Sequence, residues 1–365
     1  MKNKLLIVGT MAYDAIETPF GKVDKILGGA ATYIGLSACQ FSLESAVISV
    51  VGEDFDIRHI QLLKDKKIDV SGVEIVKGQE TFFWSGKYHK DLNTRTTLET
   101  RLNVLENFNP IIPGSLRSPE VVMLGNLSPE IQIKALEQLK NRPNLIILDT
   151  MNFWMDHYRS KLDQVIEKVD VISINEEEAR QLTGEHSLVN AAKLIHQLGP
   201  KYVIIKKGEH GALLFHHNEI FSAPALPLDK VLDPTGAGDS FAGGFAGYLT
   251  QTLDFSFNNM NSISLSSLYT SICTLNLNIC LCGYLRKSTS SGASALAGGG
   301  VFAAGAFSSI FTAATFSVVS AACSSFIGAT VSGAGVSAAG AGVSAAVAGV
   351  SSITFTSGSF DMIVG

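Results

Sequence analysis

DPTGAGDSFAGGFAGY, residues 233–248, joins a tight glycine turn to a run of small residues. Pro234 and the turn Gly236-Ala237-Gly238 precede a predicted helix that begins near Asp239. Such a turn points successive backbone N–H groups at one spot, where the helix dipole also favours negative charge. This arrangement suits the charge on a transferring phosphoryl group, and Asp239 at its edge could accept a proton from an attacking hydroxyl.

The same residues also fit a simpler interpretation, a glycine-rich helix start that Asp239 merely caps. A bare Gly-x-Gly is weak support for a binding site, because Gly340-x-Gly342 near the end of the chain matches the pattern through low complexity alone. The motif Gly-x-x-x-x-Gly-Lys-[Ser/Thr] does not occur in the sequence, which excludes a P-loop. Gly243, Gly244 and Gly247 would let the predicted helix approach its neighbours closely.

Upstream of this stretch, short apolar runs alternate with helical patterns. Most of the apolar runs are continuous in Val, Ile and Leu, as in parallel strands that are buried on both faces. We expect strands at 5–8, 46–51, 121–124, 145–148, 171–174 and 202–205, and helices at 31–41, 56–66, 130–139, 176–183 and 189–198. The alternation predicts an α/β fold, a three-layer sandwich with a central, mostly parallel sheet.

Two segments interrupt this alternation. Residues 80–100 are rich in β-branched and aromatic side chains, and residues 14–26 are similar, so we expect antiparallel strand in both. Strands inserted into an α/β core could form a small sheet over the substrate crevice, a β lid. Exchange of these lids between two subunits would give a homodimer.

Four landmarks, in order, resemble the ribokinase-like (PfkB) family of carbohydrate and nucleoside kinases over roughly residues 3–258. DPTGAGDSFAGGF is similar to the C-terminal signature of the family, and Leu27-Gly-Gly-Ala-Ala-Thr-Tyr33 to its N-terminal signature. Asn175-Glu-Glu-Glu178 resembles the Asn-x-x-Glu element, and Lys206-Lys-Gly-Glu-His-Gly211 the nucleotide-binding turn between two strands. The resemblance implies a ribokinase-like fold and transfer of a phosphoryl group from ATP to a hydroxyl of a sugar or a nucleoside.

The resemblance also implies roles for individual residues. Asp239 would be the base that deprotonates the substrate hydroxyl, and the amides of residues 236–238 would form an anion hole for the γ-phosphoryl group. Glu178, with Asn175, would organise Mg²⁺ and the phosphates through water, because Mg²⁺ dehydrates reluctantly. The other implied contacts are those of Lys207, Gly208 and Gly211 with the nucleotide, of Asp14, Gly28 and Gly29 with substrate hydroxyls, and of Asp233 and Thr235 with a monovalent cation such as K⁺, as in some relatives.

Several of these residues have plainer alternatives. Asp14 could be a turn residue, and Gly28 and Gly29 could form an ordinary loop before a helix. Glu178 could be one solvated charge in an acidic first helical turn.

The substrate is the least defined part of the prediction. Tyr33 stands where the family often has an Asn that binds substrate, which argues against a plain ribokinase-type ribose pocket. Further substrate candidates follow strand ends, where α/β folds place ligands; they are Asn126, Asp149 and Asn152. We expect a sugar as the acceptor, with a nucleoside as the alternative, because Phe82, Phe83 and Trp84 in the predicted lid could stack on a base.

Composition limits the other classes of function. The chain has 28 Lys and Arg against 33 Asp and Glu, so it lacks the basic excess typical of proteins that bind nucleic acids. Its five cysteines show no metal-ligand spacing and are expected to be reduced thiols. Too few apolar residues precede Gly9 for a secretory signal, so a cytoplasmic protein with a small-molecule substrate is expected.

The composition changes abruptly after about Asn258. Residues 259–365 form a low-complexity tract rich in Ala, Gly and Ser, with charges only at Arg286, Lys287 and Asp361. A membrane anchor at 301–319 is disfavoured by the small residues there, and a flexible extension by the apolar content of the tract. We favour a frameshift near codon 260 or a fusion, in which case the chain could also be a catalytically impaired remnant or a ligand-binding protein.

Overall fold

The computed structural model describes residues 4–41, 44–225, 227–228, 231 and 233–262. The chain divides into two units, residues 1–293 and 294–365, and every described residue lies in the first unit. The interpretations of the Ala/Gly/Ser-rich tract as an anchor, an extension, a frameshift or a fusion lie outside the described residues. Met260, in the last described helix, is buried in the core, so the described domain continues past Asn258 to Ser262.

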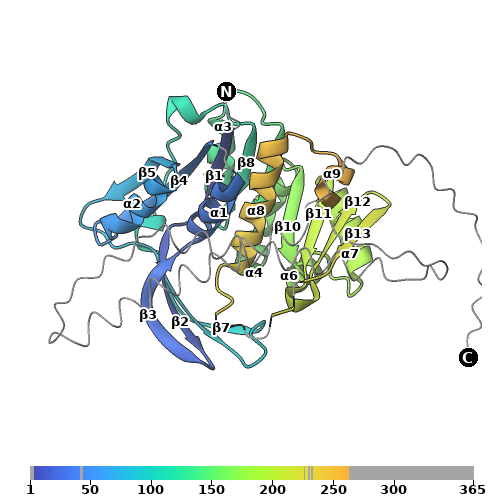
Figure 1. Cartoon of the computed structure of the whole chain (residues 1–365), viewed down its shortest axis with the longest axis horizontal. Helices are drawn as coiled ribbons and strands as arrows, with labels where there is room; N and C mark the ends of the chain where they lie inside the picture. The colour runs from blue at the N-terminus through green and yellow to red at the C-terminus, as the bar shows by residue number, and fades with distance from the viewer. Residues whose placement is uncertain (1–3, 42–43, 226, 229–230, 232, 263–365) are drawn as a thin grey trace, which may run out of the picture. The chain divides into compact units, whose positions relative to one another are not determined.

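The central sheet has nine strands among the described residues, in the order β13-β12-β11-β10-β9-β8-β1-β4-β5 (Figure 1). The strands are β1 (Lys4–Val8), β4 (Glu44–Gly52), β5 (Ile68–Val76), β8 (Val121–Leu124), β9 (Leu145–Asp149), β10 (Val171–Asn175), β11 (Tyr202–Lys206), β12 (Ala212–His216) and β13 (Glu219–Ala223). All neighbours from β5 to β11 are parallel, and β12 and β13 add an antiparallel edge. The predicted mostly parallel sheet is therefore confirmed.

Alternating side chains of each strand enter two separate hydrophobic cores. In β1, for example, Leu5 and Ile7 belong to one core, whereas Leu6 and Val8 belong to the other. The first core is covered by α1 (Ala30–Ala38), α2 (Ile57–Asp65), α8 (Ala237–Thr252) and α9 (Phe257–Ser262). The second core is covered by α3 (Pro129–Glu137), α4 (Asn152–His157), α5 (Arg159–Ile166), α6 (Glu176–Thr183) and α7 (Leu188–Gln197). Two helical layers around one sheet confirm the three-layer sandwich.

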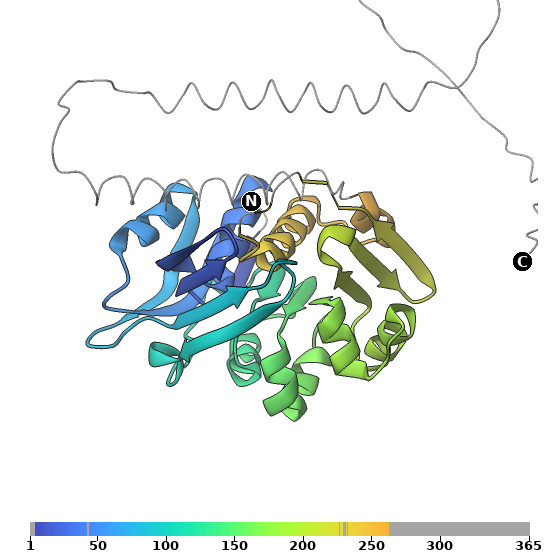
Figure 2. The ribbon, with the colours of Figure 1, turned by 90° about the horizontal axis from the view of Figure 1, so that it is seen from below.

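A second sheet of four strands, which we call the lid, has the order β3-β2-β6-β7. Its strands are β2 (Ala12–Thr18), β3 (Gly21–Gly28), β6 (Phe83–Tyr88) and β7 (Arg95–Arg101). It projects below the central sheet in Figure 1 and faces the viewer in Figure 2. Each hairpin is antiparallel as predicted, but β2 and β6, which join the two hairpins, are parallel because their chain segments enter the lid in the same direction.

Helices α1 and α8 pack side by side across the central sheet (Figure 1). A Cβ atom at Gly243 would overlap the backbone of Ile34, and one at Gly247 would lie 2.9 Å from Ala38 Cα. The hydroxyl of Ser37 also donates a hydrogen bond of 2.7 Å to the carbonyl oxygen of Ser240. The small residues of the quoted stretch therefore set how closely α8 lies against α1, as the sequence predicts.

Short 3₁₀ turns complete the described chain, at η1 (Cys39–Phe41), η2 (Asn103–Leu105), η3 (Gly114–Leu116) and η4 (Gly208–His210). The η1 turn ends the helix that the sequence predicts over 31–41. None of the helices in the described ranges combines the length and the apolar character that a membrane crossing requires.

Candidate active site

Three neighbouring parallel strands end with polar residues at the same edge of the central sheet. Asp149 ends β9, Asn175 ends β10 and Lys206 ends β11. Asn175 lies directly beside Lys206 in the β10–β11 register, and Asp149 lies beside Ser173 in the β9–β10 register. The carboxyl edge of a parallel sheet is the usual place for a ligand in an open α/β fold.

Lys206 and Asp149 form an ion pair at this edge. The Lys206 ammonium nitrogen lies 2.8 Å from Asp149 Oδ2, and the side chains are only 16% and 9% exposed. A Cβ atom built on Gly238 would lie 3.3 Å from the same ammonium. The strand-end charges are thus adjacent to the glycine turn at the start of α8.

The turn before α8 leaves backbone donors free. The amide of Ala237 donates to the carbonyl oxygen of Pro234 at 3.1 Å, and that of Ser240 donates to Gly236 at 2.8 Å. Within the described chain, the amides of Gly236 and Gly238 have no protein acceptor. Of the three amides that the sequence assigns to an anion hole, Ala237 is therefore already engaged, whereas the other two are available.

Asp239 lies in the first turn of α8 next to the strand-end charges. Burial raises the pKa of Asp239 to about 7, and the Asp149 carboxylate raises it too. The positive charges of Lys206 and Arg95 act in the opposite direction on this pKa. Burial also raises the pKa of Glu178 to about 7. A carboxyl with a pKa near neutrality is suited to exchange protons with a substrate.

Asn175 and Glu178 form a capping box at the start of α6. The Glu178 amide donates to Asn175 Oδ1 at 2.8 Å, and the Asn175 amide donates to Glu178 Oε2 at 2.8 Å. Glu178 is 4% exposed. The alternative of a solvated charge in an acidic turn is therefore wrong, because the box folds the carboxylate back into the protein.

Asp14 brings a carboxylate from the lid to the same site. It lies in strand β2 and is buried, so the alternative of a turn residue is wrong. Burial, followed by the carboxylates of Asp239 and Asp233, raises the pKa of Asp14 to about 8. Its side chain fills the space that a Cβ atom at Gly28 would need. Asp14 and Gly28 are thus in contact.

Two predicted glycines have left-handed backbone conformations at helix starts. Gly29 precedes α1 with φ 93°, and a Cβ atom there would lie 2.5 Å from the carbonyl oxygen of Thr10. Gly236 precedes α8 with φ 73°, and a Cβ atom there would lie 2.6 Å from the ring of Tyr33. Side chains are disfavoured at both positions by conformation and by space. The Tyr33 ring therefore packs against the glycine turn that precedes α8.

The predicted monovalent-cation residues lie under the lid. Asp233 Oδ1 accepts a hydrogen bond of 2.9 Å from the amide of Thr235. The buried hydroxyl of Thr235 lies 3.4 Å from the hydroxyl of Tyr88 in β6. Tyr88 therefore links the lid to the segment that precedes α8.

The predicted nucleotide residues form the tight turn between β11 and β12. The Lys207 amide donates to the carbonyl oxygen of Gly211 at 2.7 Å, and the Gly211 amide donates to Gly208 at 3.1 Å. A Cβ atom at Gly211 would overlap the carbonyl oxygen of Ala223 in β13. Gly211 therefore has a packing role in the sheet edge, whatever it contributes to binding.

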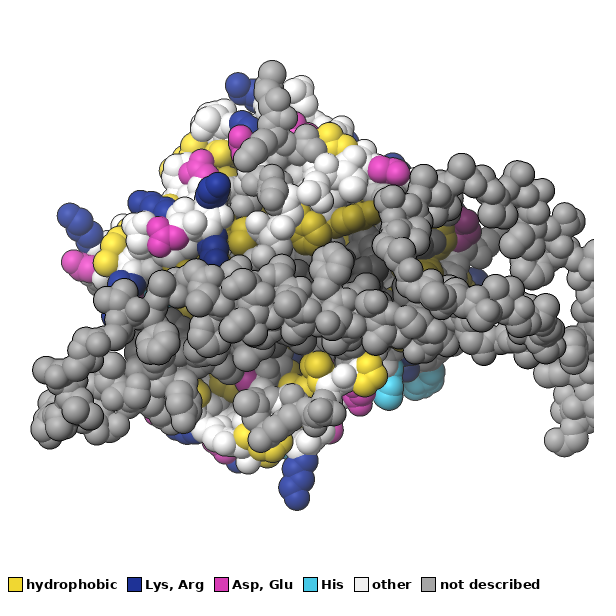
Figure 3. Space-filling model, viewed as in Figure 1, with side chains coloured by type: hydrophobic (Ala, Val, Ile, Leu, Met, Phe, Trp, Pro, Cys, Tyr) yellow, Lys and Arg dark blue, Asp and Glu magenta, His cyan; other side chains and the backbone are white. Residues whose placement is uncertain are grey.

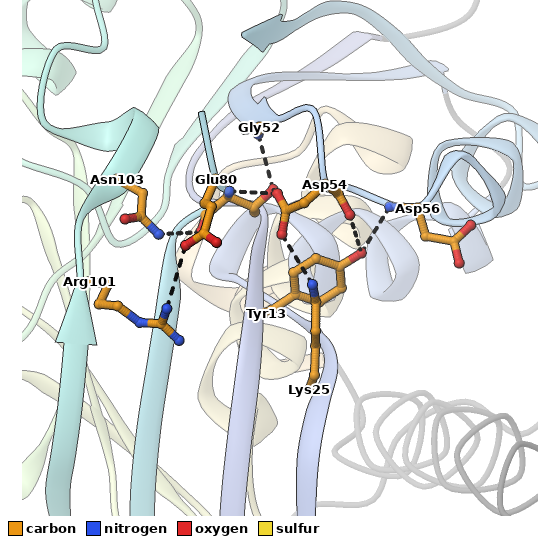
Figure 4. A network of polar contacts seen from close by, with 9 residues as sticks. Tyr13, Lys25, Gly52, Asp54, Asp56, Glu80, Arg101 and Asn103 are labelled. Atoms are coloured by element: carbon orange, nitrogen blue, oxygen red, sulfur yellow. Dashed lines mark hydrogen bonds and ion pairs between the residues drawn. The ribbon is translucent and has the colours of Figure 1, made fainter. Parts of the chain in front are cut away.

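A polar cluster joins the base of the lid to the central sheet (Figure 4). The Asp54 carboxylate, just after β4, accepts hydrogen bonds of 2.7 Å from both the amide and the hydroxyl of Thr81, and pairs with Lys25 at 3.1 Å. The hydroxyl of Tyr13 donates to the Asp54 carbonyl oxygen at 3.3 Å and accepts from the Asp56 amide at 2.8 Å. Asp54 therefore ties β2, β3 and the segment before β6 to the end of β4.

Asn126, a predicted substrate residue, is held by hydrogen bonds at the start of α4. Its Oδ1 accepts a hydrogen bond of 2.7 Å from the indole of Trp154, and its Nδ2 lies 3.1 Å from Met151 Sδ. Both polar atoms of the Asn126 side chain therefore have a protein partner without a ligand.

The residues present fit Mg²⁺ bound through water rather than in a protein cage. In the described part of the chain, no three His, Cys, Asp or Glu side chains are grouped so that they could hold a metal ion. The carboxylates of Asp149, Glu178 and Asp239 nevertheless lie around the Lys206 ammonium, so a bound cation would relieve their mutual repulsion. Mg²⁺ commonly keeps several waters and is shared with substrate phosphates.

Sequence analysis gave no role to Lys206, although this residue begins the predicted nucleotide-binding turn. Lys206 ends a buried strand, so the rule that selected Asp149 could also have selected it. Tyr88 was expected only as a lid residue that could touch substrate, because its contact with Thr235 depends on how β6 pairs with β2.

Comparisons with known proteins agree with this arrangement. Residues 2–256 match the pfkB family of carbohydrate kinases. The chain is similar to the cytidine kinase of Thermococcus kodakarensis, with 32% identity over 251 residues, 67% of this chain and 88% of the relative. It is also similar to the ATP-dependent 6-phosphofructokinase of Thermoanaerobacterium thermosaccharolyticum, with 26% identity over 272 residues, 67% of this chain and 80% of the relative.

The crystal structure of the nucleoside kinase of Methanocaldococcus jannaschii matches this fold with a TM-score of 0.59 and 22% identity, covering 74% of this chain and 90% of that one. The architecture is thus that of a ribokinase-like kinase. The chain belongs to the pfkB family of carbohydrate kinases and is a phosphotransferase with a hydroxyl group as acceptor. The family implies ATP as the phosphoryl donor and a small molecule as the acceptor.

Proposed function

We propose that this protein transfers the γ-phosphoryl group of ATP to a hydroxyl of a nucleoside, with Asp239 as the base. The observation that carries the proposal is that Asp239 interacts electrostatically with two sets of charges. One is Asp14 of the lid, and the other is the strand-end pair of Asp149 and Lys206. A hydroxyl held by Asp14 and a phosphoryl group near the strand ends would therefore meet at Asp239.

The proposed reaction needs one proton transfer and one displacement. Asp239 takes the proton of the acceptor hydroxyl while the oxygen forms a bond to the γ-phosphorus. The bond between the γ-phosphorus and the β–γ bridging oxygen breaks, and its electron pair leaves with ADP. The free amides of Gly236 and Gly238 would stabilise the charge on the transferring group.

Each remaining site residue has a place in this proposal. Lys207 and Gly208 would flank the nucleotide, and Asn175 and Glu178 would hold Mg²⁺ through water, where the ion neutralises phosphate charge. Asp233 and Thr235 would bind K⁺ beside the turn before α8. Asp14 would accept from the acceptor, which lies against Gly28 and Gly29.

The choice of a nucleoside over a sugar rests on the similarity to a cytidine kinase. Sequence analysis places the sugar first, and the similarity to a 6-phosphofructokinase keeps it as the second candidate. The lid supports a nucleoside, because Trp84 lies beside Asp14 in the β2–β6 register and so shares its face of the sheet. An indole there could stack on a base.

No macromolecular partner is needed for this function. On the face in Figure 3, basic and acidic side chains of the described residues are interspersed. A homodimer through the lid and a cytoplasmic location remain part of the proposal, the latter because the reaction consumes ATP.

The test is ADP release by the full-length protein with Mg·ATP and a panel of nucleosides and sugars. We expect kcat/KM for one nucleoside to exceed that for every sugar by at least about tenfold, as a site that hydrogen-bonds a base would discriminate. A sugar as the best acceptor would overturn the nucleoside assignment. Folded protein without turnover on any acceptor would instead indicate an impaired remnant or a ligand-binding protein.

A further inference from the structure

Lys206 is a buried cation to which the proposed function assigns no task. Its side chain is 16% exposed and forms an ion pair with Asp149 Oδ2 at 2.8 Å. The ammonium also lies beside Gly238, where an added Cβ atom would be 3.3 Å away.

The surroundings of Lys206 keep it positively charged. Burial by itself would lower the pKa of Lys206, but the carboxylates of Asp149, Glu178 and Asp239 raise it, and the net shift is upward. Moving a charged ammonium out of water is costly unless it has partners. A fixed cation at this edge is therefore maintained by acidic residues from β9, α6 and α8.

The ammonium and the free amides of the glycine turn lie close together. The Gly238 amide is at the start of α8, where backbone N–H groups and the helix dipole favour an anion. A lysine next to such a turn adds a full positive charge to these partial ones. Buried charge-assisted hydrogen bonds to phosphate oxygens are among the strongest available to a side chain.

Resting on the proposed function, we propose that Lys206 is a further catalytic residue, whose ammonium donates a hydrogen bond to a non-bridging oxygen of the γ-phosphoryl group during transfer. Asp149 is then a positioning residue that holds the ammonium toward Gly238. Lys206 keeps its protons throughout: the acceptor proton goes to Asp239, and the electron pair of the broken P–O bond leaves with ADP. The cation stabilises charge and takes no part in proton transfer.

The test compares Lys206→Met with Lys201→Met, the same change at the opposite end of β11. Lys201 is 67% exposed and pairs with Asp170, away from the strand ends. Dissociation constants are measured for Mg·ADP and for Mg·AMP-PNP, a non-hydrolysable ATP analogue that has a γ-phosphoryl group. We expect Lys206→Met to weaken AMP-PNP binding about 10- to 100-fold more than ADP binding, as loss of a charge-assisted hydrogen bond would.

Two further variants separate this role from a structural one. Lys206→Arg should recover part of the preference for AMP-PNP, because it restores the charge. If Lys206→Met does not fold, the double variant Asp149→Asn/Lys206→Met removes both charges of the ion pair, so that Asp149 is not left as a carboxylate without its partner. The double variant should also lose the preference for AMP-PNP.

The outcomes distinguish the two proposals. Equal losses for ADP and AMP-PNP, or no loss, would overturn the assignment of Lys206 while leaving a kinase with acceptor-dependent turnover intact. A wild-type protein that binds neither nucleotide would overturn the proposed function, and the role of Lys206 with it. Lys201→Met should bind both nucleotides as the wild type does.

Discussion

The side-chain amide of Asn93, between the lid strands β6 and β7, donates a hydrogen bond of 2.6 Å to the carboxylate of Glu209 in the turn after β11. A Cβ atom at Gly208 in the same turn would lie 2.7 Å from Asn93 Oδ1. The lid therefore touches the central sheet at two distant points, at Asp54 near its base and at Glu209 near its tip (Figure 4 shows the base). A ligand bound at this turn would therefore alter the contact between the turn and the lid.

Breaking the contact at the tip should weaken binding modestly. We expect Asn93→Ala and Glu209→Ala each to raise KM for ATP by about two- to fivefold, because an exposed charge-assisted hydrogen bond contributes about 0.5–1 kcal/mol. The double variant should be no worse than the single variants if the pair acts as one contact. Steady-state kinetics on the four proteins checks this, and additive losses would contradict it.

Gly236 should tolerate no side chain. In Gly236→Ala the new Cβ atom would meet the Tyr33 ring in an unfavourable backbone conformation, so we expect kcat to fall by about 10²-fold through displacement of the turn. Gly184→Ala is the matched control, because Gly184 has φ 74° and open space around its Cβ position. It should cost about 1 kcal/mol of stability and leave kcat unchanged. Equal kcat values for the two variants would contradict the role of the turn.

The rate should depend on the ionisation of Asp239. Its pKa is raised to about 7 by burial and by Asp149, and a base must be deprotonated to accept the acceptor proton. We expect kcat/KM to fall about tenfold per pH unit below about pH 7 and to level off above it. A profile that stays flat from pH 5.5 to 8 would rule out a base with this pKa.

Burial of Asp14 should make stability depend on pH. Its pKa is raised from 3.8 to about 8, so the folded state binds the proton more tightly than the unfolded state does. The unfolding free energy therefore decreases as pH rises from about 4 to about 8. Asp14→Asn removes this dependence, and at pH 8 it should be more stable than the wild type by up to about 5 kcal/mol.

Thermal unfolding of both proteins between pH 5 and 8.5 measures this effect, and the advantage of Asp14→Asn should shrink toward pH 5. The control is Asp24→Asn in β3, whose carboxylate is 82% exposed. Its difference from the wild type should be small at every pH. A wild type as stable as Asp14→Asn at pH 8 would show that burial does not raise the pKa of Asp14.

The sequence predicts the strands of the parallel sheet well, because a continuous apolar run such as Val121–Leu124 is typical of a strand that is buried on both faces. It predicts the strands at the edges of the central sheet less well. Strand β5 is not predicted, because only Ile68 and Gly72 of its nine residues are buried and it has no continuous apolar run. The short helices α4 and α5 carry weak caps and depend on tertiary packing instead.

The sequence predicts those site residues whose motif also determines their local geometry. Asp239 and Gly236 follow from one turn, and Asn175 and Glu178 from one capping box. Contacts between segments that lie far apart in the sequence cannot be predicted from a local pattern. The approach of Lys206 to Gly238 depends on the register of three strands and on the packing of α8, which no local pattern contains.

The most direct test of the central claim is phosphoryl transfer by Asp239→Asn. The substitution keeps the size of the side chain and removes the base, so Mg·ADP affinity should stay within about twofold while acceptor-dependent kcat falls by 10²- to about 10⁴-fold. That split would establish Asp239 as the base of a kinase. An Asp239→Asn protein that transfers phosphate at the wild-type rate would contradict the account.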